Sequence, residues 1–356
     1  MAIPTEAIGS IPRTARLVSA IKAFDEGRLA GEELELAYDD AVRKTVAQLE
    51  ATGSPIIGDG EQRKTHSFAT YPTEGMKNLA QDGFILPFAD GHTRCLPRLT
   101  AGPFRYGASA DRFVARTRLL TRLPIKQSVI SPSALSLFYP ETPLVDYPWD
   151  VFISHLVAEH VGEVRRCFAA GAEKVQIDFT EGRLAVKIDP SLRLLRSFVD
   201  IVNMGLSHLT AEERRRVGVH TCPGNDLGST HSLDTNYMDL LPSLFQFDVG
   251  SFYIAMACES DRTHALKMIG KLLRPGQIAF IGVTDPAATL VETPEEICES
   301  VVEIASYLPA GQFGTTDDCG FSPFCDNSTT TRDTAFAKIR SRVIGTALAS
   351  QKLKAA

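Results

Sequence analysis

The chain alternates between short apolar runs and longer segments in which apolar residues recur every three or four positions. Short apolar runs bounded by glycine, proline or polar residues indicate buried β-strands, whereas the longer period indicates amphipathic helices. Strands are predicted over residues 3–10, 55–57, 126–131, 174–178, 218–222, 249–255, 278–283 and 312–316. Helices are predicted over residues 32–49, 150–170, 191–205, 236–245, 262–273, 294–306 and 332–353.

The helix over residues 294–306 has the most clearly marked boundary. Thr293 precedes Pro294, and Glu296 follows three residues after Thr293. This is the spacing of a capping box with proline in the first helical position. We therefore expect this helix to begin directly after Thr293.

Eight strands, each followed by a helix or a long loop, predict an α/β fold of the (β/α)8 TIM barrel type, as a single domain over residues 1–356. Residues 62–110 interrupt the alternation with glycines, prolines and aromatic residues. We interpret them as an excursion of hairpin and loop after the second strand, lying over the barrel mouth. A doubly wound sheet is the alternative architecture.

Polar residues follow nearly all of the predicted strands. In a barrel the active site lies at the carboxyl ends of the strands, so these residues would surround one site. The polar strand ends are Ser10, Glu61, Ser131, Asp178, His220 with Cys222, Asp285, and Asp317 to Cys319. The remaining strand ends at Ala255. Core packing does not require polar residues at so many strand ends.

Composition and charge exclude several classes of partner. The chain has 356 residues, a net charge of −6 and 44% hydrophobic residues. No basic stripe is present to follow phosphates, so nucleic acid is not expected as a partner. No apolar run approaches ~18 residues and no signal sequence is seen, so we expect no membrane association and a cytoplasmic protein. The odd, scattered set of seven cysteines favours reduced thiols. The oligomeric state is left open.

His220-Thr221-Cys222 is the strongest local motif. Residues two apart in a strand point the same way, so an imidazole and a thiol would lie side by side. Pro223 and Gly224 then end the strand and would leave the pair in a loop-lined pocket. Nitrogen and sulfur ligands favour Zn²⁺. The alternative is an ordinary buried histidine and cysteine, since both types are frequent in cores.

Five segments in order give the chain a family resemblance over nearly its whole length. It resembles the catalytic barrel of cobalamin-independent methionine synthase and its single-domain relatives, including epoxyalkane:coenzyme M transferases. The resemblance implies a barrel of the type shared by uroporphyrinogen decarboxylase and methionine synthase. The segments are Ile8-Gly9-Ser10, Gly58-Asp59-Gly60-Glu61, Val175-Gln176-Ile177-Asp178, His220-Thr221-Cys222 and Asp318-Cys319-Gly320.

The resemblance implies a zinc site made of His220, Cys222 and Cys319. Three protein ligands leave a position for the sulfur of a thiol substrate, as a catalytic zinc requires. In the family the bound sulfur stays ionised at neutral pH and attacks carbon. A small core cysteine is the alternative for Cys319, and Cys325 is an alternative ligand.

The resemblance also assigns residues to the thiol substrate. Glu61 and Asp178 match the acidic residues that hold the amino group of homocysteine, with Asp178 also counted among the catalytic residues. Ser10 matches the serine beside the carboxylate of homocysteine. Ser131, at a strand end, and Trp149, as part of an aromatic wall, are further candidates for substrate binding. Core packing is the alternative for Trp149.

The chain departs from methionine synthase at two points. Ala255 stands where methionine synthase has a glutamate zinc ligand, unless Glu259 or Asp285 reaches the site. Methionine synthase also has an additional amino-terminal barrel that helps to bind the folate, whereas this sequence starts at the catalytic one. We therefore expect little methyl transfer from the usual folate donor.

The sequence thus predicts a zinc-dependent thiol alkyltransferase. A zinc-bound thiolate would attack a carbon electrophile, either a methyl donor or a non-methyl compound such as an epoxide. Its partners would be a small-molecule thiol and a carbon electrophile. One alternative is a lyase or other C–S or C–C bond chemistry on the same barrel, with the zinc altered or lost. A non-catalytic zinc-binding or thiol-binding module is a second alternative.

Overall fold

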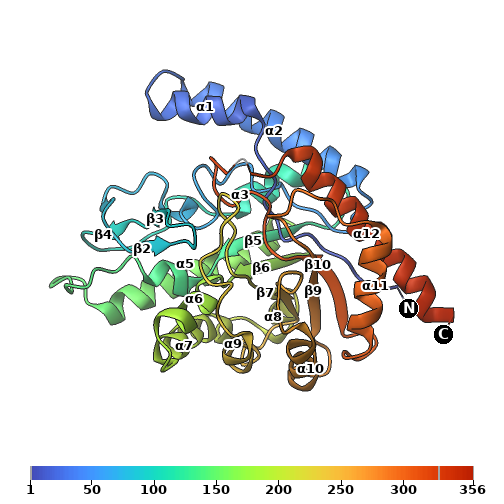
Figure 1. Cartoon of the computed structure of the whole chain (residues 1–356). Coiled ribbons are helices and arrows are strands. Elements are labelled where there is room, and N and C mark those ends of the chain that lie inside the picture. Colours follow the sequence, from blue (N-terminus) through green and yellow to red (C-terminus); the bar gives the residue numbers. More distant parts are fainter. Residues whose placement is uncertain (1, 328, 356) are drawn as a thin grey trace.

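Six parallel strands form the centre of the fold. The structure is a computed structural model and describes residues 2–327 and 329–355. The order across the sheet is β10-β9-β8-β7-β6-β5, so strands that follow one another in sequence are neighbours (Figure 1). The strands are β5 (Lys126–Ile130), β6 (Lys174–Asp178), β7 (Val217–Thr221), β8 (Ser251–Ile254), β9 (Ile278–Thr284) and β10 (Phe313–Asp317).

The first two predicted strands are reduced to single parallel bridges, made by Thr5 beside β10 and by Ile57 beside β5. The strands predicted over residues 3–10 and 55–57 are therefore wrong in length. A proline stands just before each bridge and lacks the N–H that a longer ladder would need. The backbone N–H of Ile11 donates to the carbonyl of Gly60 at 3.0 Å and joins the two segments. These contacts close the ring, and the predicted α/β barrel is confirmed.

Helices surround the sheet as the apolar periodicity predicts. The capping box at Thr293 is present, with its hydroxyl accepting from the backbone N–H of Glu296 at 3.2 Å. The helices α1, α3, α4, α6 and α8 lie outside the predicted helix ranges. The helices are α1 (Ala15–Asp25), α2 (Gly31–Ala51), α3 (Asp111–Arg118), α4 (Pro132–Ser136), α5 (Trp149–Ala169), α6 (Glu181–Ile188), α7 (Arg193–Ser207), α8 (Ala211–Arg215), α9 (Tyr237–Leu244), α10 (Arg262–Leu272), α11 (Pro294–Ala305) and α12 (Arg332–Ala355).

The predicted excursion after the second strand contains two small antiparallel ladders. β1 (Leu79–Ala80) pairs with β4 (Arg98–Leu99), and β2 (Ile85–Pro87) pairs with β3 (Thr93–Cys95). The hairpin of β2 and β3 contacts the loop after β7, where the N–H of Ala89 donates to the carbonyl of Thr230 at 2.9 Å. This hairpin therefore lies over the carboxyl end of the sheet.

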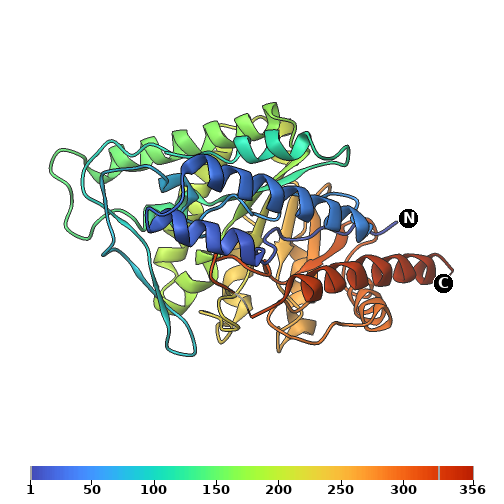
Figure 2. The ribbon, with the colours of Figure 1, turned by 90° about the horizontal axis from the view of Figure 1, so that it is seen from above.

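The first segment of the chain packs against the last helix. The N–H of Ile3 donates to the hydroxyl of Ser350 in α12 at 3.0 Å, and α1 and α2 cross the same side of the barrel (Figure 1 and Figure 2). Among the described residues, no helix is both long and apolar enough to cross a membrane.

A charged group, here called the floor cluster, fills the barrel near the amino ends of its strands. It consists of Glu6, Lys126, Lys174 and Tyr253. The carboxylate of Glu6 accepts from Lys174 Nζ at 2.5 Å and from the hydroxyl of Tyr253 at 2.6 Å. Lys126 Nζ lies 3.9 Å from the centre of the Tyr253 ring and 3.7 Å from Glu6 Oε2. Burial lowers the pKa of Lys126 to about 8.

Candidate active site

Three side chains with metal-binding atoms meet at the carboxyl end of the sheet. His220 lies in β7, Cys222 follows β7 directly, and Cys319 lies just after β10. One ligand atom from each lies within 4.8 Å of the others, and all three residues are buried. The two Sγ atoms are 3.2 Å apart. The motif near the middle of the chain and the distant cysteine therefore share one site.

The imidazole of His220 has a fixed orientation. Its Nδ1 lies 3.2 Å from the carbonyl of Tyr253 in the neighbouring strand, so the ring donates its proton there. Its Nε2 is buried and has no hydrogen-bond partner among the described residues. A metal-binding histidine is usually held in this way, with the second nitrogen free for the metal.

The loop that carries Cys319 is held by an irregularity in β10 and by Asp318. The parallel register shifts between Thr316 and Asp317, which redirects the chain after the strand. The carboxylate of Asp318 then accepts from the backbone N–H groups of residues 256, 257 and 258 at 2.7, 2.8 and 3.1 Å. These bonds fix the loop after β10 against the loop after β8.

The two thiols differ in acidity. The pKa of Cys222 lies well below its usual range because the thiol of Cys319 donates to it, while burial opposes the shift and His220 supports it. The pKa of Cys319 is raised because its ionisation would break the hydrogen bond that it donates to Cys222, because the thiol is buried, and because a second anion would lie beside the first. In the absence of a cation, the arrangement thus favours one thiolate and one thiol.

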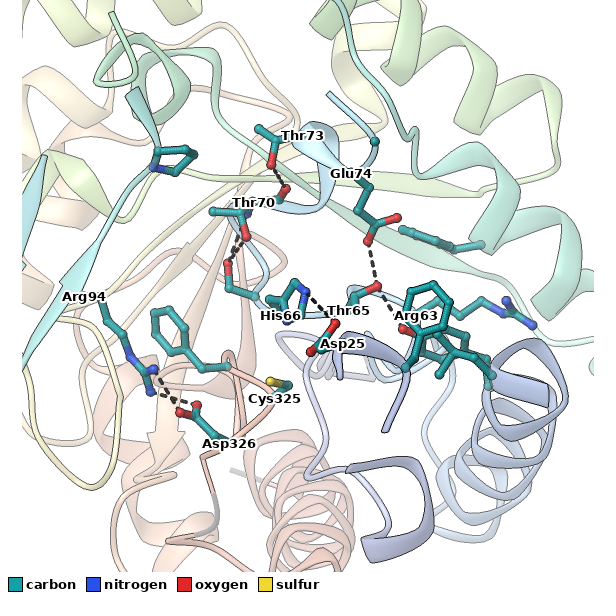
Figure 3. A pocket seen from close by; sticks show the side chains of 18 of the residues that line it. Asp25, Arg63, Thr65, His66, Thr70, Thr73, Glu74, Arg94, Cys325 and Asp326 are labelled. Atoms are coloured by element: carbon teal, nitrogen blue, oxygen red, sulfur yellow. Dashed lines mark hydrogen bonds and ion pairs between the residues drawn. The ribbon is translucent and has the colours of Figure 1, made fainter. Parts of the chain in front are cut away.

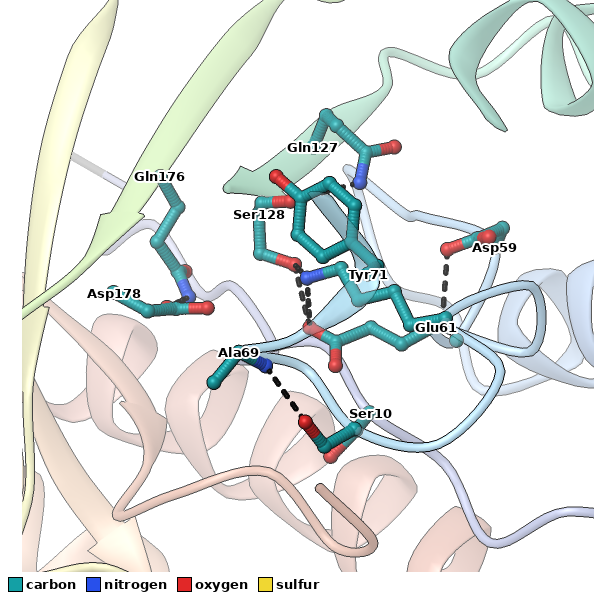
Figure 4. A network of polar contacts seen from close by, with 12 residues as sticks. Ser10, Asp59, Glu61, Ala69, Tyr71, Gln127, Ser128, Gln176 and Asp178 are labelled. Atoms are coloured by element: carbon teal, nitrogen blue, oxygen red, sulfur yellow. Dashed lines mark hydrogen bonds and ion pairs between the residues drawn. The ribbon is translucent and has the colours of Figure 1, made fainter. Parts of the chain in front are cut away.

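A small cavity of about 50 Å³ joins these groups to the predicted substrate residues. Ser10, Glu61 and Asp178 all line it together with the three metal-binding side chains. Figure 4 shows Glu61 and Asp178 with their polar neighbours Ser128 and Gln176. Burial raises the pKa of Asp178 to about 6, although the positive charge of Lys64 opposes the shift. Gln176 Nε2 donates to Asp178 at 2.7 Å. The hydroxyl of Ser10 accepts from the N–H of Ser322 at 3.1 Å, so its own proton is free to donate.

Glu61 is held by polar contacts that the sequence did not suggest. One oxygen of its carboxylate accepts from the hydroxyl of Ser128 and lies 3.2 Å from Nζ of the fully buried Lys64. Glu61 also has a positive φ of 58°, a conformation that non-glycine residues rarely adopt outside functional sites. Lys64 lies in the predicted excursion over residues 62–110, and the sequence pattern assigns it no role. Its spacing of three residues from Glu61 is the signal in the sequence that could have indicated the contact.

Ser131 and Trp149 are placed away from this cavity. Ser131 is the N-cap of α4, and its hydroxyl donates to the buried carboxylate of Glu181. Trp149 is the first residue of α5, is 44% exposed, and packs against Tyr139. Neither residue is part of the cavity lining. The substrate roles expected for them therefore have no contact to support them.

The alternative metal ligands are also placed elsewhere. Ala255 packs against Cys222 and Cys319, so an apolar methyl group occupies this side of the site. Glu259 accepts from Arg183 at 2.9 Å. Among the described residues, the clustered metal-binding groups are His220, Cys222 and Cys319 and include none of Cys325, Glu259 and Asp285.

Two further polar residues reach the cavity from the loop after β7. Asn225 Nδ2 donates to the carbonyl of Gly320 at 3.1 Å and so ties this loop to the one that carries Cys319. The imidazole of His231 lines the cavity and is buried. Burial lowers the pKa of His231 to about 4. No periodic pattern in the sequence marks either residue, because irregular loops place them.

A larger cavity of about 890 Å³ adjoins the small one, and Phe324 lines both (Figure 3). Its lining contains four arginines and four carboxylates. Three of the arginines form ion pairs within the wall at 2.5 to 2.8 Å, namely Arg63 with Glu35, Arg94 with Asp326 and Arg112 with Glu74. The larger cavity therefore has little surplus of either charge.

The family model described as "Cobalamin-independent synthase, Catalytic domain" matches residues 3–343. The chain belongs to this family of cobalamin-independent synthase catalytic domains, and the family predicted from the sequence is confirmed. A methionine synthase of Sulfurisphaera tokodaii is 22% identical over 354 residues, which cover 99% of this chain and 94% of that protein.

Two further relatives define the extent of the similarity. A 5-methyltetrahydropteroyltriglutamate–homocysteine methyltransferase of Nitrosomonas europaea is 22% identical over 325 residues, which cover 89% of this chain and 40% of that longer protein. The solved structure of a B12-independent methionine synthase from a Shewanella species matches with a TM-score of 0.78 and 19% identity, over 100% of both chains. At this identity the structural match supports the fold alone.

Proposed function

We propose that this chain is a metal-dependent thiol S-alkyltransferase, in which the sulfur of a small thiol attacks a methyl or other alkyl carbon of an electrophile. The observation that carries the proposal is the convergence of one imidazole and two thiols in a cavity that also presents two carboxylates. Membership of the cobalamin-independent synthase family supports a transferase. One relative, from Nitrosomonas europaea, is a homocysteine methyltransferase, which supports a thiol as the acceptor.

The donor set fits Zn²⁺. His220 Nε2 and the sulfur atoms of Cys222 and Cys319 are the nitrogen and sulfur ligands that zinc favours, and three protein donors are the number found in catalytic zinc sites. When bound, the cation supplies Lewis acidity that keeps a coordinated thiol ionised at neutral pH. The carbonyl of Tyr253 holds His220 in the tautomer that presents Nε2.

The cavity favours a thiol that carries an ammonium group. Its lining includes the carboxylates of Glu61 and Asp178 but no lysine or arginine among the described residues. An ammonium group would bind between these carboxylates, and the free hydroxyl proton of Ser10 could bind a substrate carboxylate. Homocysteine has this combination of groups. A thiol with only an anionic group, such as a sulfonate, would have no cationic partner here.

The electrophile is proposed to be more reactive than methyl-folate. Ala255 contributes no charge, so two thiolates nearly neutralise Zn²⁺. A less anionic site lowers the pKa of a bound thiol but also weakens the thiolate as a nucleophile. An activated alkyl donor such as an epoxide suits that nucleophile. The larger cavity behind Phe324 could admit it, and its balanced charges do not favour a polyanionic donor.

The direct test is an assay of the zinc-loaded protein with L-homocysteine and two electrophiles, 5-methyltetrahydropteroyltriglutamate and propylene oxide. We expect mass spectrometry to detect S-alkylated homocysteine with the epoxide and little methionine with the folate. The Ala255→Glu variant should shift this ratio toward methionine. Efficient methionine formation by the unmodified protein would contradict the role of Ala255, and failure to bind zinc would contradict the S-alkyltransferase itself.

A further inference from the structure

His231 reaches the catalytic cavity from the loop between β7 and α9, and α6 holds this loop in place. Arg183 donates to three carbonyl groups of residues 232–235 at 2.9 to 3.0 Å. Lys187 Nζ donates to the carbonyl of His231 itself at 3.0 Å. The backbone N–H of His231 donates to the carbonyl of Pro223 at 2.9 Å. The backbone of this histidine is therefore anchored on both sides.

The ring of His231 is packed and yet incompletely bonded. Its neighbour Phe88, from the hairpin of β2 and β3, lies edge to face with ring centres 5.8 Å apart. Gly224 has a φ of +83°, and a Cβ at this position would lie 2.3 Å from the imidazole, so only glycine leaves room for the ring. Nδ1 of His231 is buried and has no partner among the described residues. A buried nitrogen without a hydrogen bond is costly, and a ligand or proton that binds there would explain why it is retained.

The other acid–base groups of the cavity have roles in the proposed function. His220, Cys222 and Cys319 are the proposed metal ligands. Glu61 and Asp178 are proposed to bind the ammonium group of the substrate. Among the described lining residues, the imidazole of His231 is the base to which the proposed function assigns no role.

We propose that His231 is a catalytic residue whose neutral imidazole accepts the proton of the substrate thiol. This inference rests on the proposed function, since it requires a thiol in the cavity. Burial keeps the imidazole neutral before the thiol enters; the thiolate of Cys222 opposes this effect, whereas the cationic Arg183 and Lys187 add to it. A neutral imidazole can accept a proton, whereas an imidazolium cannot.

The proposed step balances without another reactant. The S–H bond of the thiol breaks, its electron pair stays on sulfur as a thiolate, and the proton forms an N–H bond with His231. Imidazole becomes imidazolium, and the new positive charge lies beside the new negative charge. When the sulfur attacks the epoxide, the C–O bond breaks with its electron pair on oxygen. His231 then gives its proton, directly or through water, to that alkoxide, which restores the neutral ring.

The test counts protons while the thiol binds without an alkyl donor. Zinc-loaded protein is titrated with L-homocysteine by calorimetry, in buffers that differ in ionisation enthalpy. In the unmodified protein we expect well under one proton per bound thiol to reach the buffer, because the new thiolate raises the pKa of His231 from about 4 and the imidazole holds part of the proton. In His231→Gln about one proton per bound thiol should be released, and kcat should fall about 10²- to 10⁴-fold.

A matched control is His92→Gln. His92 stacks on Phe88 with ring centres 4.3 Å apart but does not line the cavity, so this variant should behave like the unmodified protein. Equal proton release by His231→Gln and the unmodified protein would overturn the proposal for His231. If the unmodified protein binds no thiol, the proposed function fails instead.

If the His231→Gln variant does not fold, a second measurement, made on the unmodified protein, still tests the proposal. Nuclear magnetic resonance of ¹⁵N-histidine-labelled protein should show one imidazole changing from neutral to cationic when L-homocysteine is added. A spectrum in which no imidazole changes its protonation on thiol binding would also overturn the proposal.

Discussion

The barrel has buried polar and charged groups at both of its ends, but the contacts of these groups differ between the two ends. In the floor cluster, Glu6 accepts from Lys174 and Tyr253, and Lys126 faces the ring of Tyr253. At the carboxyl end, His220 Nε2 and His231 Nδ1 are buried without a partner among the described residues. Lys126 Nζ also makes no hydrogen bond, but it lies beside the opposite charge of Glu6 and over the Tyr253 ring. The unpartnered atoms of the candidate site are instead imidazole nitrogens, which can bind a metal or a proton.

This difference separates stability from function. Groups that satisfy one another at the amino end of a barrel contribute mainly to the fold, whereas active sites lie at the carboxyl end. Buried atoms without partners are costly and are retained where a ligand or a reaction uses them. Substitutions at the two ends should therefore change different measured quantities.

The largest effect is expected from removing a metal ligand. His220→Ala or Cys222→Ser should abolish zinc binding and lower kcat about 10³-fold or more, because the cation supplies several kcal/mol of transition-state stabilisation. Elemental analysis and steady-state assays measure the two effects. Cys325→Ser is the matched control and should retain its zinc, since Cys325 is not one of the clustered groups. Full zinc content in Cys222→Ser would remove the site from consideration.

A substitution in the floor cluster should lower stability and leave metal binding unchanged. Glu6→Gln leaves the buried Lys126 and the half-buried Lys174 without their carboxylate and should lower the free energy of unfolding by about 3–5 kcal/mol. Zinc content and the KM for the thiol should not change. Chemical denaturation together with zinc analysis tests this. A variant of normal stability would show that the floor cluster does not contribute to the fold as described.

A smaller effect is expected at Asp178, which touches the substrate region but not the metal. Asp178→Asn should weaken binding of L-homocysteine by about 1.5–3 kcal/mol, the usual value of a hydrogen bond to a charged group, and leave zinc bound. Calorimetry should give this loss for homocysteine but not for 2-mercaptoethanol, which has no ammonium group. Equal losses for both thiols would argue against a carboxylate–ammonium contact.

The smallest effect concerns Lys126, whose burial is costly. Lys126→Met should raise the free energy of unfolding at neutral pH by about 1 kcal/mol or more, because an apolar side chain replaces a desolvated charge. The pKa of Lys126 is lowered to about 8 from its ordinary 10.5, so in this range the unfolded chain holds more protons than the folded protein. The contribution of Lys126 to the stability of the unmodified protein therefore rises from pH 8 to 10.5.

The advantage of the Lys126→Met variant should fade over the same range of pH. Thermal unfolding of both proteins across this range measures the difference. A constant difference at all pH values would contradict the buried, charged lysine.

The sequence predicted the parts of the fold that depend on local pattern. Strands such as β6 and helices such as α11 are marked by apolar period and capping, and the order of the family motifs identified the barrel. The first two strands were overestimated, because a proline beside each bridge shortens the ladder. That effect depends on strand pairing and is not visible in the apolar pattern.

The residues of the candidate site that lie at the ends of strands could be predicted from the sequence. Period-two spacing placed His220 beside Cys222, and the family resemblance added Cys319. Lys64 and His231 were missed because three-dimensional contacts of irregular loops place them. Trp149 was expected near the substrate, but the loop before α5 directs it toward the surface.

The central claim is that a substrate sulfur joins His220, Cys222 and Cys319 at one metal. X-ray absorption spectroscopy of the zinc-loaded protein, before and after L-homocysteine is added, tests it most directly. The account predicts that the number of sulfur scatterers at about 2.3 Å from zinc rises from two to three. An unchanged sulfur number at saturating thiol would contradict the claim.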